Sequence, residues 1–189
     1  MTDRERNTNS LRRAVILLAA TTAMVAIFWV GLKQIRQRVR LQQEQSKREW
    51  RQKSFDAVKA GGSTAYIMDS KLLPMLADDA DCKQIVTNLD FGSTEIDAAD
   101  ANFVAMLKNV TSITFYCTTG TEHVLQAAKT LPITNLHFEM PDLTPESYLM
   151  LDVFPDLENV RFEHVMAPEW IDRLESKLPG VKIDAPFTH

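Results

Sequence analysis

The sequence predicts an α/β fold built from a repeated strand-and-helix unit, because one short phrase recurs four times at a nearly constant spacing. The copies begin at Val86, Val110, Ile133 and Leu157, which are 24, 23 and 24 residues apart. In each copy the first, fourth and sixth residues are apolar and the residues between them are polar. This alternation predicts a strand that buries one face and exposes the other.

The segments between the phrases predict helices with the same period. Each helix start is marked by a capping side chain or by a proline suited to the first helical position. The residues that mark these starts are Asp97, Thr121, Thr144 and Pro168. The apolar residues that end the helices are Leu107, Leu131, Phe154 and Leu178.

A single unit of this size cannot bury its apolar residues alone, so the units are expected to stack into one continuous core. A period in the twenties with this apolar pattern is the signature of a leucine-rich-repeat solenoid. We therefore expect about four repeats of 23–24 residues over residues 86–189, with parallel strands on one face and helices on the other. Val181 begins an incomplete fifth repeat.

The N-terminal part of the chain predicts a membrane anchor. A basic tail over residues 1–13 precedes an uncharged apolar run over residues 14–32. Nineteen helical residues reach roughly 29 Å, which is enough to cross the hydrocarbon core of a bilayer. A buried helix or a cleaved signal peptide is the alternative, but the run lacks a good cleavage site. We expect a single-pass membrane protein; the flanking basic residues slightly favour a cytoplasmic C-terminal domain, and the orientation stays open.

Residues 33–60 predict a helical stalk, because they are rich in Gln, Arg, Lys and Glu, contain no Pro or Gly, and end at Gly61. The stalk could be a solvated helix, could rest its arginines on anionic lipid, or could form a homodimer. Residues 61–85 predict a cap for the first repeat, with a short strand over 64–69 and a brief helix over 70–77.

The chain resembles small bacterial single-span membrane proteins with divergent leucine-rich repeats. The matching features are the helix over residues 52–58, Gly61 and Gly62 with Tyr66, the segment 77–79, and the turn over 92–97. The later repeats lack that Gly-x-Thr-x-Ile turn. The resemblance implies protein–protein interaction and brings no catalytic residues with it.

The candidate binding site is the concave face of the solenoid, which should carry the outward residues of each strand. Adjacent strands lie about 4.8 Å apart, so these residues should form three polar columns. They are Asn88, Asp90, Ser112, Thr114, Tyr116, Asn135, His137, Glu139, Asn159, Arg161 and Glu163. The alternative interpretation is a solvated sheet face that binds nothing.

No catalytic motif is present. The chain has no phosphate-binding loop, zinc-ligand spacing or nucleophile elbow. A metal site at His137, Glu139 and Glu163 would need His164, which should point away from His137. Cys82 and Cys117 are interpreted as small buried residues rather than a disulfide.

The sequence therefore predicts a non-enzymatic interaction module without metal or cofactor. The basic region up to Lys53 is interpreted as a topology and lipid signal, so nucleic acid is not an expected partner. The expected partner is a protein that the sequence does not identify. The alternative function is a structural spacer, or a homo-oligomer joined through the stalk.

Overall fold

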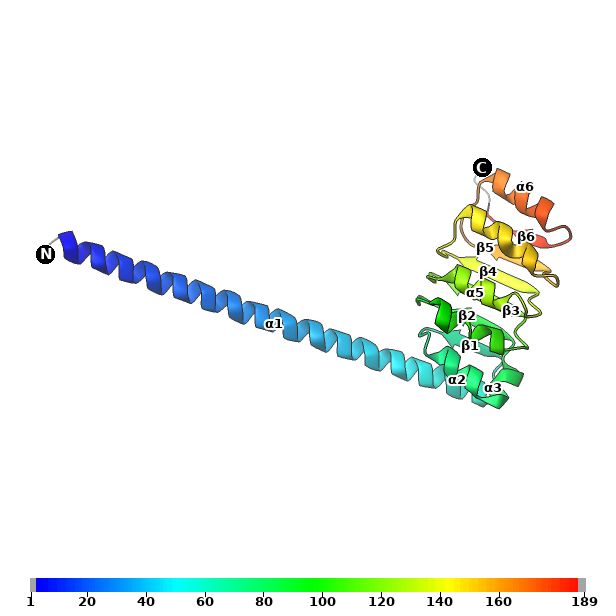
Figure 1. Cartoon of the computed structure of the whole chain (residues 1–189), viewed down its shortest axis with the longest axis horizontal. Coiled ribbons are helices and arrows are strands. Elements are labelled where there is room, and N and C mark those ends of the chain that lie inside the picture. The colour runs from blue at the N-terminus through cyan, green and yellow to red at the C-terminus, as the bar shows by residue number, and fades with distance from the viewer. Residues whose placement is uncertain (1–2, 187–189) are drawn as a thin grey trace. The chain divides into compact units, whose positions relative to one another are not determined.

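The computed structural model describes the backbone of residues 3–186 and the side chains of Met24 and residues 28–186. The chain divides into two compact units, residues 1–46 and 47–189. The first unit consists of the N-terminal part of helix α1 (Asp3–Lys59) (Figure 1). The second unit contains the last turns of this helix and all the strands.

The membrane span expected over residues 14–32 needs correction. Within the described residues, no helix combines the length and the apolar character needed to cross a bilayer. The side chains of the apolar run lie mostly outside the described residues, and from Lys33 to Lys59 helix α1 carries many charges. The same finding contradicts the expected localisation, which was a single-pass membrane protein with a cytoplasmic C-terminal domain.

The second unit is an α/β structure organised around a six-stranded parallel sheet. The strands lie in chain order, so each one pairs with the strand that follows it in the sequence (Figure 1). They are β1 (Thr64–Ile67), β2 (Asn88–Phe91), β3 (Ser112–Tyr116), β4 (Asn135–Glu139), β5 (Asn159–Phe162) and β6 (Lys182–Asp184). The strands expected in the four phrases are confirmed, and β1 and β6 extend the sheet at both ends.

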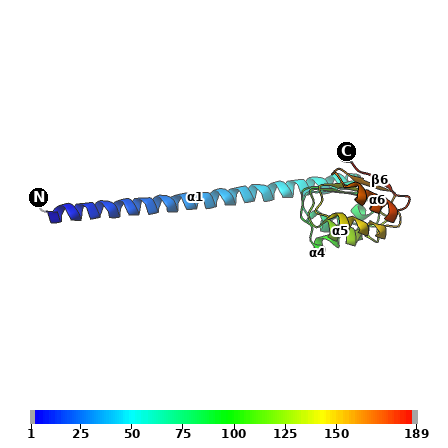
Figure 2. The same cartoon turned by 90° about the horizontal axis from the view of Figure 1, so that it is seen from above.

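Short helices connect successive strands, and Figure 2 shows α4, α5 and α6 on the same side of the sheet. The α-helices are α2 (Leu72–Asp78), α3 (Ala80–Ile85), α4 (Ala98–Ala101), α5 (Thr121–Ala128) and α6 (Pro168–Lys177). The 3₁₀-helices are η1 (Val104–Met106) and η2 (Pro145–Val153). Parallel strands need such crossover connections, and here the crossovers cover one face of the sheet.

The core lies between the sheet and these helices. The first, fourth and sixth residues of all four phrases are buried. The sixth residues form a stack in which the rings of Phe91, Phe115, Phe138 and Phe162 lie 5.4–5.6 Å apart. Stacked aromatic pairs stabilise a core beyond the burial of their area, so this ladder stabilises the packing beneath neighbouring strands.

Two of the expected helix caps are confirmed. The Asp97 carboxylate accepts a hydrogen bond from the backbone N–H of Asp100 at 2.7 Å, and the Thr144 hydroxyl accepts one from Ser147. Thr121 instead occupies the first turn of α5, and its hydroxyl donates to the carbonyl of Thr118.

Helix α5 takes its cap from a different segment of the chain. The Asp142 carboxylate accepts hydrogen bonds from the N–H groups of Gly120, at 2.6 Å, and Thr121, at 3.1 Å. Gly120 has a φ of 80°, a conformation that favours glycine, and a side chain there would overlap the carbonyl of Ile96.

The C-terminal turns of α1 cover the outer edge of β1. The Ser54 hydroxyl accepts a hydrogen bond from the N–H of Tyr66 at 3.1 Å and donates one to its carbonyl at 3.0 Å. Arg51 forms an ion pair with Asp69 at 2.9 Å, and Val58 is fully buried. Because these contacts satisfy an otherwise open strand edge, the compact unit begins at Lys47, ahead of the boundary expected at Gly61.

Candidate functional site

The strand register gathers the predicted site residues on the face of the sheet opposite the buried phenylalanines, here called the outer face. Its first column contains Asn88, Ser112, Asn135 and Asn159, each opposite the next. The Asn159 amide donates to the Asn135 side-chain oxygen at 3.0 Å. Asn88 and Asn135 donate to the hydroxyl of the preceding threonine. Most of this column is therefore engaged in bonds within the sheet.

The second and third columns hold the charged side chains. In the second, Asp90, Thr114, His137 and Arg161 lie opposite one another in that order. In the third, Tyr116 lies opposite Glu139. Glu163 follows β5, and its backbone N–H donates to the carbonyl of Phe138. The structure thus brings the predicted residues together, while their binding role stays a prediction.

Three of these side chains form an ionic cluster. The Glu163 carboxylate lies 2.6 Å from the Arg161 guanidinium and 3.2 Å from His137 Nε2. All three side chains are partly exposed, so each pair should stabilise the fold by only about 0–1 kcal/mol. The cluster nevertheless engages the Arg161 guanidinium and the His137 ring, so both already have a partner within the chain.

Asp90 and Glu139 are partly buried carboxylates that lie outside this ionic cluster. Partial burial is the main cause that raises the pKa of Asp90; nearby His137 opposes the rise and Glu139 adds to it. Around them, Tyr66 is 53% exposed, Met68 43% and Tyr116 42%. Acidic and aromatic side chains therefore lie together on the outer face of strands β1 to β4.

Tyr66 and Met68 were not among the predicted site residues. They belong to β1 and the residue after it, which the sequence interpretation assigned to a cap rather than to the repeats. The exposure of residues 64–67 alternates as it does in the other strands. The matching alternation in the sequence, Thr-Ala-Tyr-Ile, was the signal that could have identified Tyr66 as an outer-face residue.

His164 lies away from the outer face. Its ring packs against Tyr148 and Phe162, and its Nε2 is 3.3 Å from the Tyr148 hydroxyl. Burial lowers the pKa of His164, which favours the neutral imidazole. In the part of the chain with described side chains, no group of three possible metal ligands was found.

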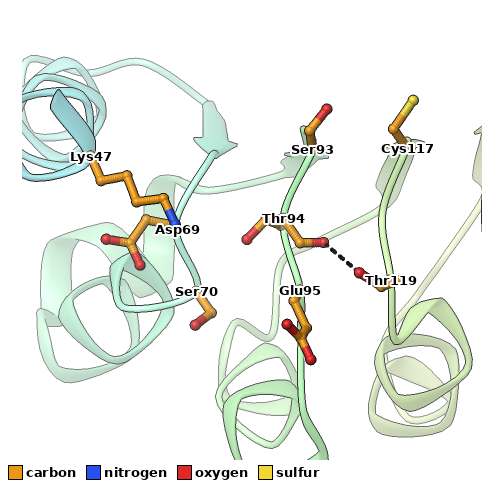
Figure 3. Close-up of a pocket in the computed structure, with 8 residues that line it drawn as sticks. All are labelled: Lys47, Asp69, Ser70, Ser93, Thr94, Glu95, Cys117 and Thr119. Atoms are coloured by element: carbon orange, nitrogen blue, oxygen red, sulfur yellow. Dashed lines mark hydrogen bonds between the residues drawn. The ribbon is translucent and has the colours of Figure 1, made fainter. Parts of the chain in front are cut away.

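A polar cavity of about 480 Å³ opens beyond the C-terminal ends of β1, β2 and β3 (Figure 3). Its lining residues are Lys47, Asp69, Ser70, Ser93, Thr94, Glu95, Cys117 and Thr119. Asp69 is already paired with Arg51, and Thr119 donates to the carbonyl of Thr94. Because Ser93, Glu95 and Thr119 are exposed, this cavity is an open, solvated groove.

Both cysteines are free thiols. Cys82 is buried in the core, and burial, followed by the Asp79 carboxylate, raises its pKa to about 11. Cys117 is partly exposed at the rim of the polar groove and adopts a φ of 47°. A thiol with a raised pKa is a poor nucleophile at neutral pH, so Cys82 is a structural residue.

Comparison with protein-family models, with curated proteins and with solved structures found no match to this chain.

Proposed function

We propose that the chain is a non-enzymatic interaction module, in which a leucine-rich-repeat solenoid uses the outer face of its sheet to bind a partner protein. The repeat assignment is supported by the placement of each phrase on one strand in the same register. It is also supported by the ladder of phenylalanines that joins these strands.

The observation that carries the binding role is the continuous outer face itself. Its aromatic and charged side chains project from a parallel sheet whose other face is fixed by a buried core. Tyr and Arg are common among residues that dominate binding energy at protein interfaces. A sheet positions such side chains without the ordering cost that a flexible loop would incur on binding.

Residue-specific photocrosslinking tests this proposal. A photoreactive residue at Thr114, in the centre of the outer face, should crosslink one partner protein in stoichiometric yield in the native cell. The same residue at Lys129, which is exposed on the helical side, is the matched control and should not crosslink it. Equal capture at both positions, or capture at neither, would contradict the proposal.

A second candidate function is self-association through the first unit. Leu32, Ile35 and Val39 are separated by three and four residues, and all three are exposed. This spacing places them on one side of a helix, as in a helix–helix interface. Under this alternative, sedimentation should show a dimer that Ile35→Asp dissociates, and the outer face should crosslink no partner.

A further inference from the structure

On strands β1 to β4, the outer face carries two acidic side chains, Asp90 and Glu139, among apolar and aromatic ones. Asp90 lies between Tyr66 on β1 and Thr114 on β3, because these residues are register partners. Two residues further along β3, on the same face as Thr114, Tyr116 lies opposite Glu139. Asp90 on β2 and Glu139 on β4 thus lie on the same face of the sheet, on either side of β3.

Neither carboxylate has a cationic partner among the residues with described side chains. The Arg161 guanidinium and the His137 ring both contact the Glu163 carboxylate instead. Among the described side chains, Asp90 and Glu139 are therefore partly buried carboxylates that form no ion pair, and His137 offsets only part of the electrostatic cost at Asp90. Such charges favour a cation from outside the chain, since desolvated charges cost free energy unless they are paired.

The apolar groups beside Asp90 complete the patch. Met68 extends over Gly92, where a Cβ would overlap the methionine sulfur. The glycine thus leaves room for Met68 to lie over β2, and Met68, Tyr66 and Tyr116 are all exposed. Methionine and tyrosine offer surfaces for the aliphatic stem and the planar head of a long basic side chain.

We propose that the patch formed by Tyr66, Met68, Asp90, Tyr116 and Glu139 binds an arginine side chain of the partner protein. This inference rests on the proposed function, since it specifies what the outer face recognises. A guanidinium bonds to a carboxylate through two parallel hydrogen bonds and stacks on tyrosine rings, whereas a lysine ammonium does only part of this. The negative charge of the patch disfavours nucleic acid, whose phosphates it would repel.

The test uses two fluorescein-labelled peptides, Gly-Gly-Arg-Gly-Gly and the same sequence with citrulline, the uncharged isostere of arginine. Fluorescence anisotropy with the full-length chain should show that the arginine peptide binds roughly ten-fold more tightly, the scale of a charge-assisted hydrogen bond. Absence of binding up to about 1 mM arginine peptide, or equal binding of the two peptides, would overturn the proposal.

Variants assign the binding to the patch. Asp90→Asn should weaken binding of the arginine peptide by roughly ten-fold. Tyr116→Ala should also weaken it, while Tyr116→Phe, which keeps the ring, should restore most of the affinity. Asp156→Asn removes an exposed carboxylate between η2 and β5 and is the matched control. If Asp156→Asn weakened binding as much as Asp90→Asn, the attraction would be a general charge effect and the patch assignment would fail.

Two readouts separate failure of this inference from failure of the proposed function. If the crosslinker at Thr114 captures a partner protein equally well with Asp90→Asn and no arginine peptide binds, only the arginine inference fails. If Thr114 captures no protein, the proposed function fails. Sedimentation of the same samples covers a third case. If the chain self-associates and Asp90→Asn abolishes this association, the patch binds the basic segment 33–53 of a second copy. That result would overturn the proposal that the partner is a different protein.

Discussion

At the scale of single residues, the alternation within each phrase was readable from the sequence. Leu136 and Phe138 are buried, and His137 between them is partly exposed on the outer face. The ionic cluster at Glu163 was not readable, because its bonds depend on side-chain conformations at the end of β5. Tyr66 and Met68 were missed because Gly62, two residues before β1, stands at the position where the phrase has its first apolar residue.

The alternation predicts a large difference between neighbouring substitutions. Leu136→Ala should lower the free energy of unfolding by about 2–5 kcal/mol, because it removes buried methyl groups and leaves a cavity. His137→Ala should lower it by about 0–1 kcal/mol, since it breaks one exposed pair with Glu163. Denaturant-induced unfolding of both variants provides the measurement. Equal losses would mean that the assigned strand register is wrong.

The Asp90 carboxylate should lower the free energy of unfolding at neutral pH. Its pKa in the folded protein is raised, mainly by partial burial, so the folded chain holds this proton more tightly than the unfolded chain. Folding is therefore favoured as the pH falls through this pKa and disfavoured above it. Asp90→Asn should raise the melting temperature at pH 7, and the difference should shrink in acid, where both states are protonated.

Thermal unfolding across this pH range checks the prediction, with Asp156→Asn as the control. A lower melting temperature for Asp90→Asn at pH 7 would indicate that the carboxylate has a stabilising partner in the folded chain. A charge that costs stability and yet lies on the proposed interaction surface is consistent with the usual trade-off between stability and function.

At the scale of elements, the caps of α4 and η2 were predictable because each capping residue immediately precedes its helix. The cap of α5 was not, since Asp142 follows the next strand and reaches back to the start of α5. Such a contact depends on how two repeats stack, which local sequence does not describe. Helix η2 also differs from the expected regular helix, because its nine residues form 3₁₀ turns.

Because the Asp142 carboxylate caps α5, we predict that this loop side chain stabilises the helix. Asp142→Ala should lower the free energy of unfolding by about 0.5–2 kcal/mol, the usual range for loss of a helix N-cap. Asp142→Asn keeps an oxygen acceptor and should recover part of that loss. Urea unfolding of the two variants tests this. An unchanged midpoint for Asp142→Ala would show that water replaces the carboxylate without cost.

At the scale of the whole molecule, the repeat period predicted the order and direction of the strands, and the strand expected over residues 64–69 is present as β1, although it was assigned to a cap. The phrase begins at Val86, whereas β1 and the last turns of α1 precede it. Those turns were interpreted as a stalk because their composition is polar. The contacts of Ser54 and Val58 cannot be inferred from composition, since they depend on how the helix lies against the strand edge.

These contacts predict that two N-terminal deletions behave differently. A fragment that begins at Lys47 keeps Ser54, Val58 and the pair between Arg51 and Asp69, so it should fold and unfold cooperatively. A fragment that begins at Gly61 loses all of them and leaves the edge of β1 open. Open strand edges promote association between chains, so this fragment should be less stable and should aggregate.

Urea unfolding and light scattering of the two fragments, at matched concentrations, distinguish these outcomes. Within the longer fragment, Ser54→Ala serves as the focused variant, because it removes both hydrogen bonds to Tyr66 while keeping the helix. It should lower the free energy of unfolding by about 1–3 kcal/mol, the cost of leaving backbone groups without partners. If the fragment from Gly61 were as stable and as soluble as the fragment from Lys47, the repeats would supply their own cap and α1 would end outside the folded unit.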